Sequence, residues 1–536
     1  MSLFKKSIIN RRDFSNLIGW IFAARTSSGS ESKELDGRDV KNDYINIKDF
    51  GVIGDGITDN ANSLSRVEHA RAFTVAPKGI YKSFSTVPLT YMLANSSAIF
   101  KSNQLYAYSI NTGANIRGGS YDTSGGVVFN VTAGAVDVII SDVNINNQSA
   151  LNSTALNFAQ SNVKNARIIG NNIRSRGYAV LTNAPADDVD GIIIGLNNLR
   201  SDESDAVELN APGKLHSNIV VVGNTLAAGD VGNNKNSGFA LGVARARGVT
   251  VVANSIKESR QEAIHFEDEQ HTNTVIGNTA LNVGGAGFLA GAWSTGLGEG
   301  MPVLGNTFRA KAGSTSAGLY MVYDNNGSLP GMVLMGNRAV QFARGIEAGA
   351  EDIVAIGNFI ESASECAIKM VGGGKLHGEN YARNCTTLVK SYKGTVVGKI
   401  TSSTTPKTIL DTSAHKKNAL GTVLKGFSFP KSGVRLEEKS RSLVNICTLP
   451  LLMYGRIICI VSSVKSLDHI YFSADVKFDG KNFITTNSLS KTFGSLAVGS
   501  SNGIELNDSE FSISIFNGGN VAYVNLFFDF DGEYYM

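Results

Sequence analysis

The sequence predicts an all-β chain whose central part is a right-handed parallel β-helix, and three observations carry that prediction. Glycine is abundant, at 58 of 536 residues, whereas proline is scarce, at 9. This mixture is typical of many short strands joined by tight turns. A β-branched run followed by a small residue and an asparagine recurs through the middle of the chain. The chain is also longer than one compact core usually supports, which favours an elongated repeat or several modules.

The repeated asparagine is the most informative of these observations. It stands at Asn171, Asn197, Asn224, Asn254, Asn278, Asn306, Asn337, Asn358 and Asn380. The spacing varies from 21 to 31 residues, so the chain lacks the fixed period of a helical repeat. If coils stack as parallel strands about 4.8 Å apart, each amide can hydrogen-bond to the next, and asparagine tolerates the left-handed backbone of such a bend. A Gly-Asn turn explains a single copy, whereas nine in register favour stacked coils.

Residues 1–43 are basic at first and then polar and low in complexity, which predicts an attachment segment followed by a linker. The apolar run Leu17–Ala24 is too short to span a bilayer. It follows a pair of arginines, a pattern similar to a twin-arginine export signal. We favour a short basic anchoring segment, because glycine and tryptophan interrupt the run and no clear cleavage site follows. Export by a twin-arginine signal stays the alternative.

Two further regions follow the linker. Residues 44–400 hold the repeat, which is expected to form the β-helix and its glycan-binding or catalytic surface. The repeat stops at the Ser/Thr-rich stretch 401–408, and residues 401–536 carry alternating strands such as Phe511 to Phe516. This pattern predicts a C-terminal β-sandwich-like domain. Such a domain would either hold several chains together or cap the open end of the β-helix.

Charge and cysteine content argue against several classes of protein. The net charge is only +3, and no basic block with interleaved aromatic residues occurs, so nucleic acid is not an expected partner. The four cysteines, Cys366, Cys385, Cys447 and Cys459, lack C-x-x-C spacing, so we expect buried free thiols and neither a disulfide framework nor a zinc site. No motif predicts a cofactor.

A second strand in each coil is expected to carry the chemistry, because side chains alternate between the two faces of a strand. The inward column aligns as Val180, Val207, Phe239, Ile264, Phe288, Leu319, Ile346 and Ile368. The next residues point outward as Leu181, Glu208, Ala240, His265, Leu289, Tyr320, Glu347 and Lys369. Two positions further on, the outward column begins Asn183, Asn210, Gly242, Glu267 and Gly291. This alignment predicts a groove with a floor of small residues and walls of carboxylates.

Glu208 and Glu267 form the first predicted catalytic pair. Glycoside hydrolysis needs two carboxyl groups, about 5.5 Å apart in retaining enzymes and roughly 6.5–9.5 Å apart in inverting ones. Residues two coils apart are separated by about 10 Å at the backbone, which favours the inverting geometry. Glu262 and Asp205 are alternates, placed in turns at the edge of the groove, and His265 would orient a carboxylate or the substrate.

The same groove contains residues suited to binding sugar. Aromatic side chains can stack on sugar rings, and Trp293, Tyr320 and Tyr323 are the candidates. Polar and charged candidates along the same strands are Asn210, Arg344, Glu347 and Lys369. A long groove lined by carboxylates and aromatic residues suits a polysaccharide chain.

Two alternatives to hydrolysis remain, a lyase and a glycan-binding protein without activity, whereas a metal site is not favoured. A lyase that acts on a uronic-acid polymer needs a base at C5, for which His265, Tyr320, Arg344 or Lys369 would serve. We favour hydrolysis because acids outnumber bases on the central coils, and glycan binding without cleavage is a further alternative. Asp268, Glu269 and His271 are interpreted as an ordinary solvated turn, because the spacing of a zinc or calcium site is absent.

The segment DFGVIGDGITDN, from Asp49 to Asn60, resembles the opening of the pectate-lyase-like β-helix family. The resemblance rests on Phe50-Gly51, Gly54-Asp55-Gly56, Asp59, Pro77, Gly79 and Tyr81. That family is found in bacteriophage tailspikes and related polysaccharide-degrading enzymes. Together with the coils, the resemblance covers roughly residues 44–400, and it carries no catalytic residue. The segment between Asp59 and Pro77 is shorter than usual, so the capping helix of the family is not assured from sequence.

The whole chain resembles a short-adaptor phage tailspike. The resemblance implies a homotrimer in the virion tail that degrades bacterial capsular or other surface polysaccharide. It also implies that residues 1–43 bind the phage tail or another tail fibre.

Overall fold

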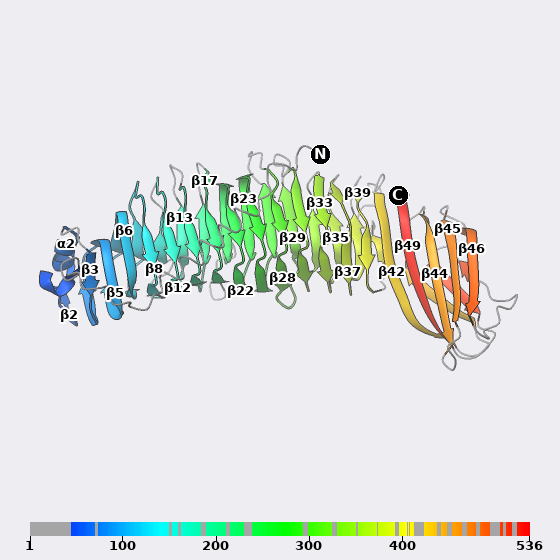
Figure 1. Ribbon diagram of the computed structural model, residues 1–536, viewed down its shortest axis with the longest axis horizontal. Helices are drawn as coiled ribbons and strands as arrows, with labels where there is room; N and C mark the ends of the chain where they lie inside the picture. Colours follow the sequence, from blue (N-terminus) through cyan, green and yellow to red (C-terminus); the bar gives the residue numbers. More distant parts are fainter. Residues whose placement is uncertain are drawn as a thin grey trace, which may run out of the picture.

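The computed structural model shows an elongated rod of stacked β-coils followed by a broad antiparallel sheet (Figure 1). It describes residues 44–69, 73–148, 153–158, 162–183, 189–210, 215–229, 238–292, 299–323, 330–349, 352–371, 374–391, 396–404, 406, 408–411, 423–436, 441–447, 453–463, 469–478, 483–493, 504–506, 511–516 and 522–535. Beyond residue 406 only the backbone is described. The predicted attachment segment, residues 1–43, lies outside the described residues.

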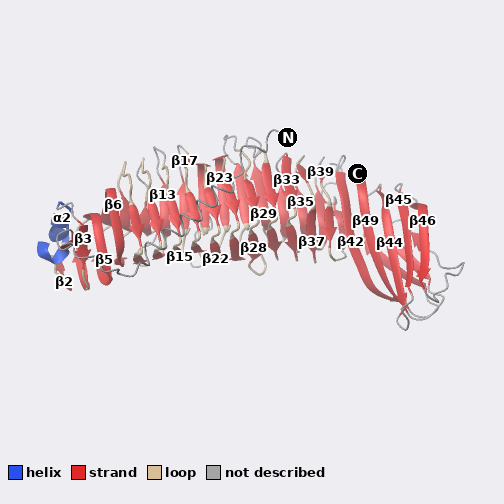
Figure 2. Cartoon of the chain, viewed as in Figure 1, coloured by secondary structure: helices blue, strands red, loops and turns tan. Residues whose placement is uncertain are grey.

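The rod opens with a short irregular cap. Its elements are β1 (Tyr44–Asn46), η3 (Ile47–Phe50), β2 (Asp55–Asp59), α2 (Ala61–His69), β3 (Phe73–Ala76), β4 (Gly79–Ser83), β5 (Val87–Ser102) and β6 (Tyr106–Thr123). The short segment after Asp59 therefore does hold a helix, and α2 lies at the end of the rod against β5 (Figure 2). Helices of the described part are too short and too polar to cross a bilayer.

The sequence motif of this cap has a steric basis. A Cβ atom on Gly54 would lie 3.1 Å from the Cα atom of Gly79 and 3.0 Å from the ring of Tyr81. The hydroxyl of Tyr81 donates to the carbonyl of Pro77 at 2.7 Å. Glycine is therefore needed where the two backbones cross, and the tyrosine ties the crossing to the next turn.

Each coil contains three strands, one more than the sequence alignment predicts. The first face consists of β8 (Ile139–Ser141), β11 (Arg167–Ile169), β14 (Ile193–Gly195), β18 (Val220–Val222), β21 (Thr250–Val252), β24 (Thr274–Ile276), β27 (Pro302–Leu304), β30 (Met332–Met335), β33 (Asp352–Ile356), β36 (Lys375–His377) and β39 (Val396–Val397). The second face consists of β9 (Asn144–Asn147), β12 (Asn172–Ser175), β15 (Asn198–Ser201), β19 (Thr225–Ala228), β22 (Ser255–Ser259), β25 (Thr279–Val283), β28 (Thr307–Ala310), β31 (Arg338–Val340), β34 (Phe359–Glu361), β37 (Asn380–Arg383) and β40 (Ile400–Ser402). The alignment missed this face because its short strands follow the asparagine directly.

The third face follows the second along the chain. It consists of β7 (Val127–Val131), β10 (Thr154–Asn157), β13 (Tyr178–Asn183), β16 (Val207–Asn210), β20 (Leu241–Arg247), β23 (Ile264–His271), β26 (Phe288–Ala292), β29 (Ala317–Tyr323), β32 (Arg344–Ala348), β35 (Cys366–Met370), β38 (Thr387–Ser391) and β41 (Thr408–Asp411). A short extra strand, β17 (His216–Ser217), pairs with the end of β20. Strands of all three faces pair in parallel with their counterparts one coil away. The predicted parallel β-helix is confirmed.

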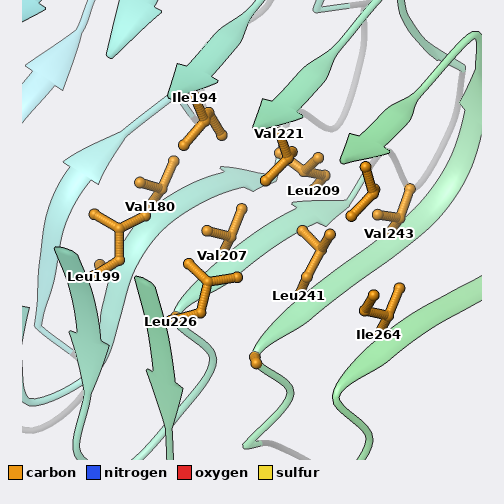
Figure 3. Packing of buried hydrophobic residues seen from close by; sticks show 14 of the residues in the cluster. Val180, Ile194, Leu199, Val207, Leu209, Val221, Leu226, Leu241, Val243 and Ile264 are labelled. Carbon is orange, nitrogen blue, oxygen red and sulfur yellow. The ribbon is translucent and has the colours of Figure 1, made fainter. Parts of the chain in front are cut away.

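The core fills the space between the three faces. Figure 3 shows Val180, Val207, Leu241 and Ile264 from the third face meeting Ile194 and Val221 from the first and Leu199 and Leu226 from the second. All of these side chains are fully buried, and each contributes roughly 1.5–3 kcal/mol by leaving water. Similar apolar layers repeat from coil to coil, and their burial stabilises a rod whose interior is narrow.

The predicted inward column is correct on every coil except one. Leu241, and not Phe239, pairs with Val207 on one side and Ile264 on the other. Phe239 precedes the strand and is partly exposed. The alignment is therefore displaced by two residues on this coil. A displacement of two preserves the inward–outward alternation, so hydrophobic pattern cannot detect it.

The asparagine ladder is confirmed along its full predicted length. The Nδ2 atom of each residue donates to the Oδ1 atom of the next, from Asn171 to Asn380, at 2.8–2.9 Å. Asn254 also donates to the carbonyl of Val221 at 2.9 Å and accepts from the backbone N–H of Asn224 at 3.0 Å. These amides are buried, so the ladder satisfies polar groups that water cannot reach.

The left-handed residue of each bend is the one before the asparagine, except at Asn380, where it is Gly378, two residues before. It is glycine on most coils, for example Gly223 with φ of 64° and Gly277 with φ of 63°. Leu196 and Ala253 occupy the same place with φ of 58° and 53°. The expectation that asparagine itself takes this conformation is wrong, because its side chain must continue the ladder while the preceding residue makes the bend.

The rod continues into antiparallel strands at its C-terminal end. The start of β42 (Val423–Leu436) pairs in parallel with β39 and β40, and β42 then pairs antiparallel with β49 (Ala522–Tyr535). The antiparallel sheet goes on through β44 (Met453–Ser463), β45 (His469–Phe478) and β46 (Phe483–Phe493). A separate sheet contains β43 (Arg441–Cys447), β48 (Phe511–Phe516) and β47 (Ile504–Leu506). The all-β, two-sheet character expected of this region is present, and the domain boundary at residue 400 stays a prediction.

Replacing a ladder amide is expected to destabilise the rod. Asn254→Ala removes the Oδ1 atom that accepts from the backbone N–H and from Nδ2 of Asn224. It also removes the Nδ2 atom that donates to the carbonyl of Val221, and all three hydrogen bonds are buried. We expect a loss of about 3 kcal/mol in the free energy of unfolding. The control is Asn198→Ala, which removes an exposed amide bonded to Asn172 at 2.8 Å and should change stability by less than about 0.5 kcal/mol. Urea unfolding followed by circular dichroism measures both, and equal losses would contradict the role given to burial.

Candidate active site

The acidic and imidazole side chains picked out in the sequence lie together on the third face. The register places Glu208 beside Gly242, and Gly242 beside His265, on the adjacent strands β16, β20 and β23. Asn210 is beside Ala244, which is beside Glu267. The small residues between them are thus Gly242 and Ala244, whereas the alignment predicted Ala240 and Gly242. The two-residue displacement on β20 is the reason.

The carboxylate of Glu208 lies directly over the backbone of Gly242. A Cβ atom on Gly242 would overlap Oε2 of Glu208 and would come within 3.3 Å of the ring of Phe239. A glycine inside a strand often marks such a close approach. The absence of a side chain at this one position lets the carboxylate of Glu208 reach across toward the next coil.

Asp205 lies in the connection before β16, as predicted, but its side chain is buried and does not stand at an exposed edge. Its Oδ1 atom accepts from the backbone N–H groups of Gly238 and Phe239 at 2.6 and 2.7 Å. Gly238 and Phe239 lie just before β20, so their hydrogen bonds tie the Asp205 carboxylate to the next coil. Burial raises the pKa of Asp205 to about 6, although both backbone hydrogen bonds act to lower it.

Glu208 shares a hydrogen bond with Asp205 and keeps part of its surface exposed. Burial raises the pKa of Glu208 well above its usual value, and the nearby charges of Asp205 and Glu267 raise it further. In their shared hydrogen bond Glu208 is the partner whose pKa is raised and Asp205 the partner whose pKa the bond lowers, which favours the proton on Glu208 with Asp205 as the acceptor. A carboxyl group with a raised pKa is therefore partly exposed on this face of the rod.

His265 is held between two glutamates. Its Nδ1 atom is 3.4 Å from Oε2 of Glu262, and its Nε2 atom is 3.2 Å from Oε2 of Glu267. Burial by itself would lower the pKa of His265, but the hydrogen bonds to both glutamates outweigh it and raise the pKa to about 9. The ring of Phe239 packs on the imidazole with centroids 4.4 Å apart. At neutral pH the imidazole is thus a cation that donates from both nitrogens.

The two glutamates differ in their access to solvent. The side chain of Glu267 is 34% exposed and that of Glu262 is 14% exposed. Glu262 is covered by the next coil, where a Cβ atom on Gly285 would come within 2.8 Å of its Oε1 atom. Glu267 is therefore the more open of the two glutamates that His265 contacts, and the imidazole orients it.

The remaining predicted site residues lie further along the third face. Tyr320 follows Leu289 in register and is partly exposed. Glu347 is buried, and it pairs with Arg344 at 2.5 Å and with Lys369 at 2.8 Å. Asn210 holds the buried His216 by its backbone carbonyl at 2.9 Å. Trp293 and the side chain of Tyr323 lie outside the described residues, so their predicted roles are untested.

The arginine and lysine predicted to bind substrate belong to an ion-pair network. Besides Glu347, Arg344 pairs with Glu365 at 2.9 Å, and Glu365 pairs with Lys390 at 2.9 Å. The network connects three coils of the third face. These cations already pair with carboxylates of the same chain, so they are less available to pair with an anionic group of a ligand.

The end of β23 corrects the predicted turn at Asp268–His271. The strand continues to His271, and the left-handed conformation falls on Asp268 alone, with φ of 61°, where β20 and β23 change register. Glu269 and His271 pair with each other at 3.0 Å. In the described part of the chain, no three His, Cys, Asp or Glu side chains are arranged so that they could hold a metal ion.

Sequence reasoning missed the site roles of two residues and displaced a third. Phe239 covers the imidazole, and Tyr178 lies beside Asp205 and Glu208 and hydrogen-bonds to Ser204. Gly242 was predicted as a small outward residue beside Asn210 and Glu267, but it lies beside Glu208 and His265 and makes room for the Glu208 carboxylate. Phe239 and Tyr178 gave no signal, because their roles depend on which coils become neighbours.

Gly242→Ala tests the close approach at this site. The new methyl group must push the carboxylate of Glu208 aside, because that carboxylate is the mobile partner in the contact. We expect an intact fold, with Glu208 rotated away from Asp205 in the crystal structure of the variant. The control is Gly195→Ala, where the nearest atom is 3.5 Å from the new Cβ. An unmoved Glu208 in Gly242→Ala would contradict the steric account.

Comparison with known proteins gives likenesses to solved structures only. No protein-family model matches the sequence, and no curated protein matches it. A tailspike of Pseudomonas phage phi297 has 11% identity and a TM-score of 0.41, over 91% of this chain and 99% of that one. A tailspike of Acinetobacter baumannii bacteriophage Fri1, described as a capsular polysaccharide depolymerase, has 11% identity and a TM-score of 0.28, over 93% and 88% of the two chains. The catalytic unit of a GH87 α-1,3-glucanase from Streptomyces thermodiastaticus has 13% identity and a TM-score of 0.35, over 72% and 66%. The chain is a β-solenoid by its own parallel strand pairing, and phage tailspikes and a glucanase are among the solved structures to which it is similar.

Proposed function

We propose that the chain is a phage tailspike depolymerase that cleaves a bacterial capsular or other surface polysaccharide by hydrolysing internal glycosidic bonds. The observation that carries this proposal is a carboxyl group with a raised pKa and a second, more open carboxyl group on the same face, two coils apart. Glu208 supplies the first, with its pKa raised by burial and by its acidic neighbours, and Glu267 supplies the second. Glycoside hydrolysis uses these two forms together.

In this mechanism Glu208 donates its proton to the glycosidic oxygen as the bond breaks. Glu267 accepts a proton from the water that attacks the sugar from the opposite side. The two residues come from strands two coils apart, so about 10 Å separates their backbones. Side chains that reach toward each other from that distance leave room for a water molecule, which favours the inverting outcome.

In this proposal the neighbouring groups stabilise the proton on Glu208 and orient the carboxylate of Glu267. Asp205 holds the proton on Glu208 through their hydrogen bond, and its own charge is stabilised by the N–H groups of Gly238 and Phe239. His265 orients Glu267 and balances part of the negative charge of the cluster. Glu262 fixes the other side of the imidazole.

The geometry favours hydrolysis over β-elimination. A lyase needs a neutral base near C5 of a uronate and a cation that neutralises the uronate carboxylate. His265 is protonated near neutral pH because Glu262 and Glu267 raise its pKa to about 9, after burial has acted in the opposite direction. Arg344 and Lys369 are paired with Glu347. Three of the four candidate groups for elimination are thus held in ion pairs. The fourth, Tyr320, is partly exposed, and burial raises the pKa of its hydroxyl above the usual value, which makes it a poorer source of a base at neutral pH.

The substrate is expected to lie along the third face, parallel to the axis of the rod. Tyr320 offers an aromatic ring two coils beyond His265, and Asn210 offers an amide one coil before Gly242. Arg344, Glu347 and Lys369 lie further in the same direction. Trp293, the residue after β26 in the sequence, and Tyr323, the last residue of β29, are proposed as additional stacking platforms.

The proposed assembly and location rest on the resemblance of the whole chain to a short-adaptor phage tailspike. We propose a homotrimer in the virion tail, with residues 1–43 bound to the tail or to another fibre and the β-rich region after residue 400 holding the chains together or capping the rod. Export by a twin-arginine signal is the alternative for residues 1–43. Mass spectrometry of the purified protein distinguishes these, because an exported protein loses its first residues and a tail protein keeps them.

The experiment that tests the reaction is product analysis with a panel of bacterial capsules. We expect shorter oligosaccharides with saturated ends from the unaltered protein, and a loss of 100-fold or more in rate for Glu208→Gln and for Glu267→Gln. The control is Glu269→Gln, two residues along the same strand, which should keep its rate. Ultraviolet-absorbing unsaturated ends would indicate elimination, and binding without any products would indicate a non-catalytic spike.

The pH dependence of cleavage tests the role of Asp205. Its charge raises the pKa of Glu208, so its removal in Asp205→Asn should let Glu208 lose its proton at lower pH. The alkaline limb of the profile of kcat/KM against pH is therefore expected to move to lower pH. In Glu269→Gln the limb should stay in place. A limb that moves upward in Asp205→Asn would contradict the arrangement.

A further inference from the structure

The strand β23 contains a bulge directly after Glu267, the residue proposed to accept a proton from water. Its register with β20 shifts there, since Ala244 is beside Glu267 whereas Ala246 is beside Gln270. Two residues of β23 therefore lie opposite one residue of β20. A bulge beside an active site often serves to aim a side chain.

The bulge is not a requirement of the coil. On the next coil Gly291 is beside Glu267, and Ala292 after it is a buried core residue. There β26 pairs with β29 as far as Ala292 without a shift. A regular β23 would give Asp268 the same inward position, and its carboxylate would then lie in the apolar core. The left-handed backbone of Asp268, with φ of 61°, avoids this, and its side chain is partly exposed.

A buried amide fixes the bulge from inside the rod. Gln270 is fully buried, and its Nε2 atom donates to the carbonyl of Glu267. The same atom donates to the carbonyl of Val243 on β20 at 3.5 Å. The Oε1 atom of Gln270 accepts from Nδ2 of Asn273 at 2.6 Å, and Oδ1 of Asn273 accepts from the backbone N–H of Val249 at 2.8 Å. Both polar atoms of the Gln270 side chain are thus engaged, and they tie the backbone of Glu267 to the neighbouring coil.

An ion pair holds the bulge from outside. The Nε atom of Arg245 on β20 is 3.7 Å from Oδ2 of Asp268. Arg245 also has a left-handed backbone, with φ of 53°, so the two residues that pair across the bulge share this conformation. Residues other than glycine seldom adopt it, and such strained positions cluster at functional sites.

We propose that Gln270 is a positioning residue for Glu267. Arg245 and Asp268 assist it from the outer side of the strand. Because the carboxylate of Glu267 is partly exposed, packing alone does not fix its place. By holding the carbonyl of Glu267, the buried amide sets where this side chain leaves the strand, and it thereby keeps the carboxylate 3.2 Å from Nε2 of His265. This role rests on the proposed function, in which Glu267 acts on the attacking water.

Kinetics of Gln270→Met test the role in the reaction. Methionine has a similar length but lacks the amide, so the backbone of Glu267 loses its inner contact. We expect kcat to fall about 10-fold or more while KM stays within about threefold, because a displaced Glu267 slows the reaction and leaves the substrate bound. Asn254→Ala is the matched control, since it removes buried amide hydrogen bonds at another bend of the coils. It should lower stability without changing kcat.

The titration of His265 tests the same role without any substrate. Burial lowers the pKa of His265, whereas the hydrogen bonds to Glu262 and Glu267 outweigh it and raise the pKa to about 9. A weakened contact with Glu267 should therefore lower this pKa in Gln270→Met, as measured by NMR of protein with isotope-labelled histidine. The signal is assigned by its loss in His265→Gln. Asn254→Ala should keep the pKa of the unaltered protein.

Arg245→Gly is a second variant that should keep the fold, because glycine adopts a positive φ without steric cost. Loss of the cation alone would raise the pKa of His265, whereas release of Glu267 lowers it. We expect it to fall, and this sign decides the matter if Gln270→Met does not fold. In a folded Gln270→Met, an unchanged kcat or an unchanged pKa of His265 would overturn the positioning role. If the unaltered protein cleaves no polysaccharide but the pKa still falls, the proposed reaction fails and the hold on Glu267 stands.

Discussion

The rest of the structure depends on the register between successive coils, which the buried asparagine ladder holds. Each ladder amide bonds to the next amide and to a backbone carbonyl on the neighbouring coil. Because strand alternation has a period of two, a slip of one residue would turn every inward side chain outward. The ladder resists such a slip, since a displaced amide would lie buried without its partners. Residues that are far apart in sequence thereby become fixed neighbours.

The candidate site is a direct product of that register. Glu208 and His265 are 57 positions apart in the sequence, and they flank Gly242 on consecutive strands. The cluster gathers four carboxyl groups around one imidazole, which by repulsion alone would destabilise the fold. Two backbone N–H groups on Asp205 and a shared proton between Asp205 and Glu208 relieve part of this repulsion. Because the remaining carboxyl groups still repel one another, the site needs a rigid scaffold to hold them together, and the stacked apolar layers supply it.

Much of this could be predicted from the sequence, because repetition exposes the register. The asparagine positions predicted the ladder, and strand alternation predicted that Glu208, His265 and Glu267 share a face. Phe239 was misplaced by two residues, since such a displacement leaves the alternation unchanged. Asp205 was expected at the groove edge, because its burial depends on backbone donors from another coil. The helix α2 was not assured because a short segment lacks a distinctive pattern.

The three faces of the rod have different surface chemistry. From β14 to β30 the outward positions of the first face are uncharged, the second presents paired arginines and carboxylates, and the third presents the acid cluster and the ion-pair network around Glu347. A regular coil tolerates such different outward residues, since the inward layers and the ladder alone hold the fold.

The central claim is that Glu208 remains protonated at neutral pH next to an ionised Asp205. Infrared difference spectroscopy in heavy water tests it most directly, because a protonated carboxylic acid absorbs apart from carboxylates. The account predicts a protonated-acid band at pH 7 that disappears in Glu208→Gln and persists in Glu269→Gln. A spectrum at pH 7 without that band, or a band that survives in Glu208→Gln, would contradict it.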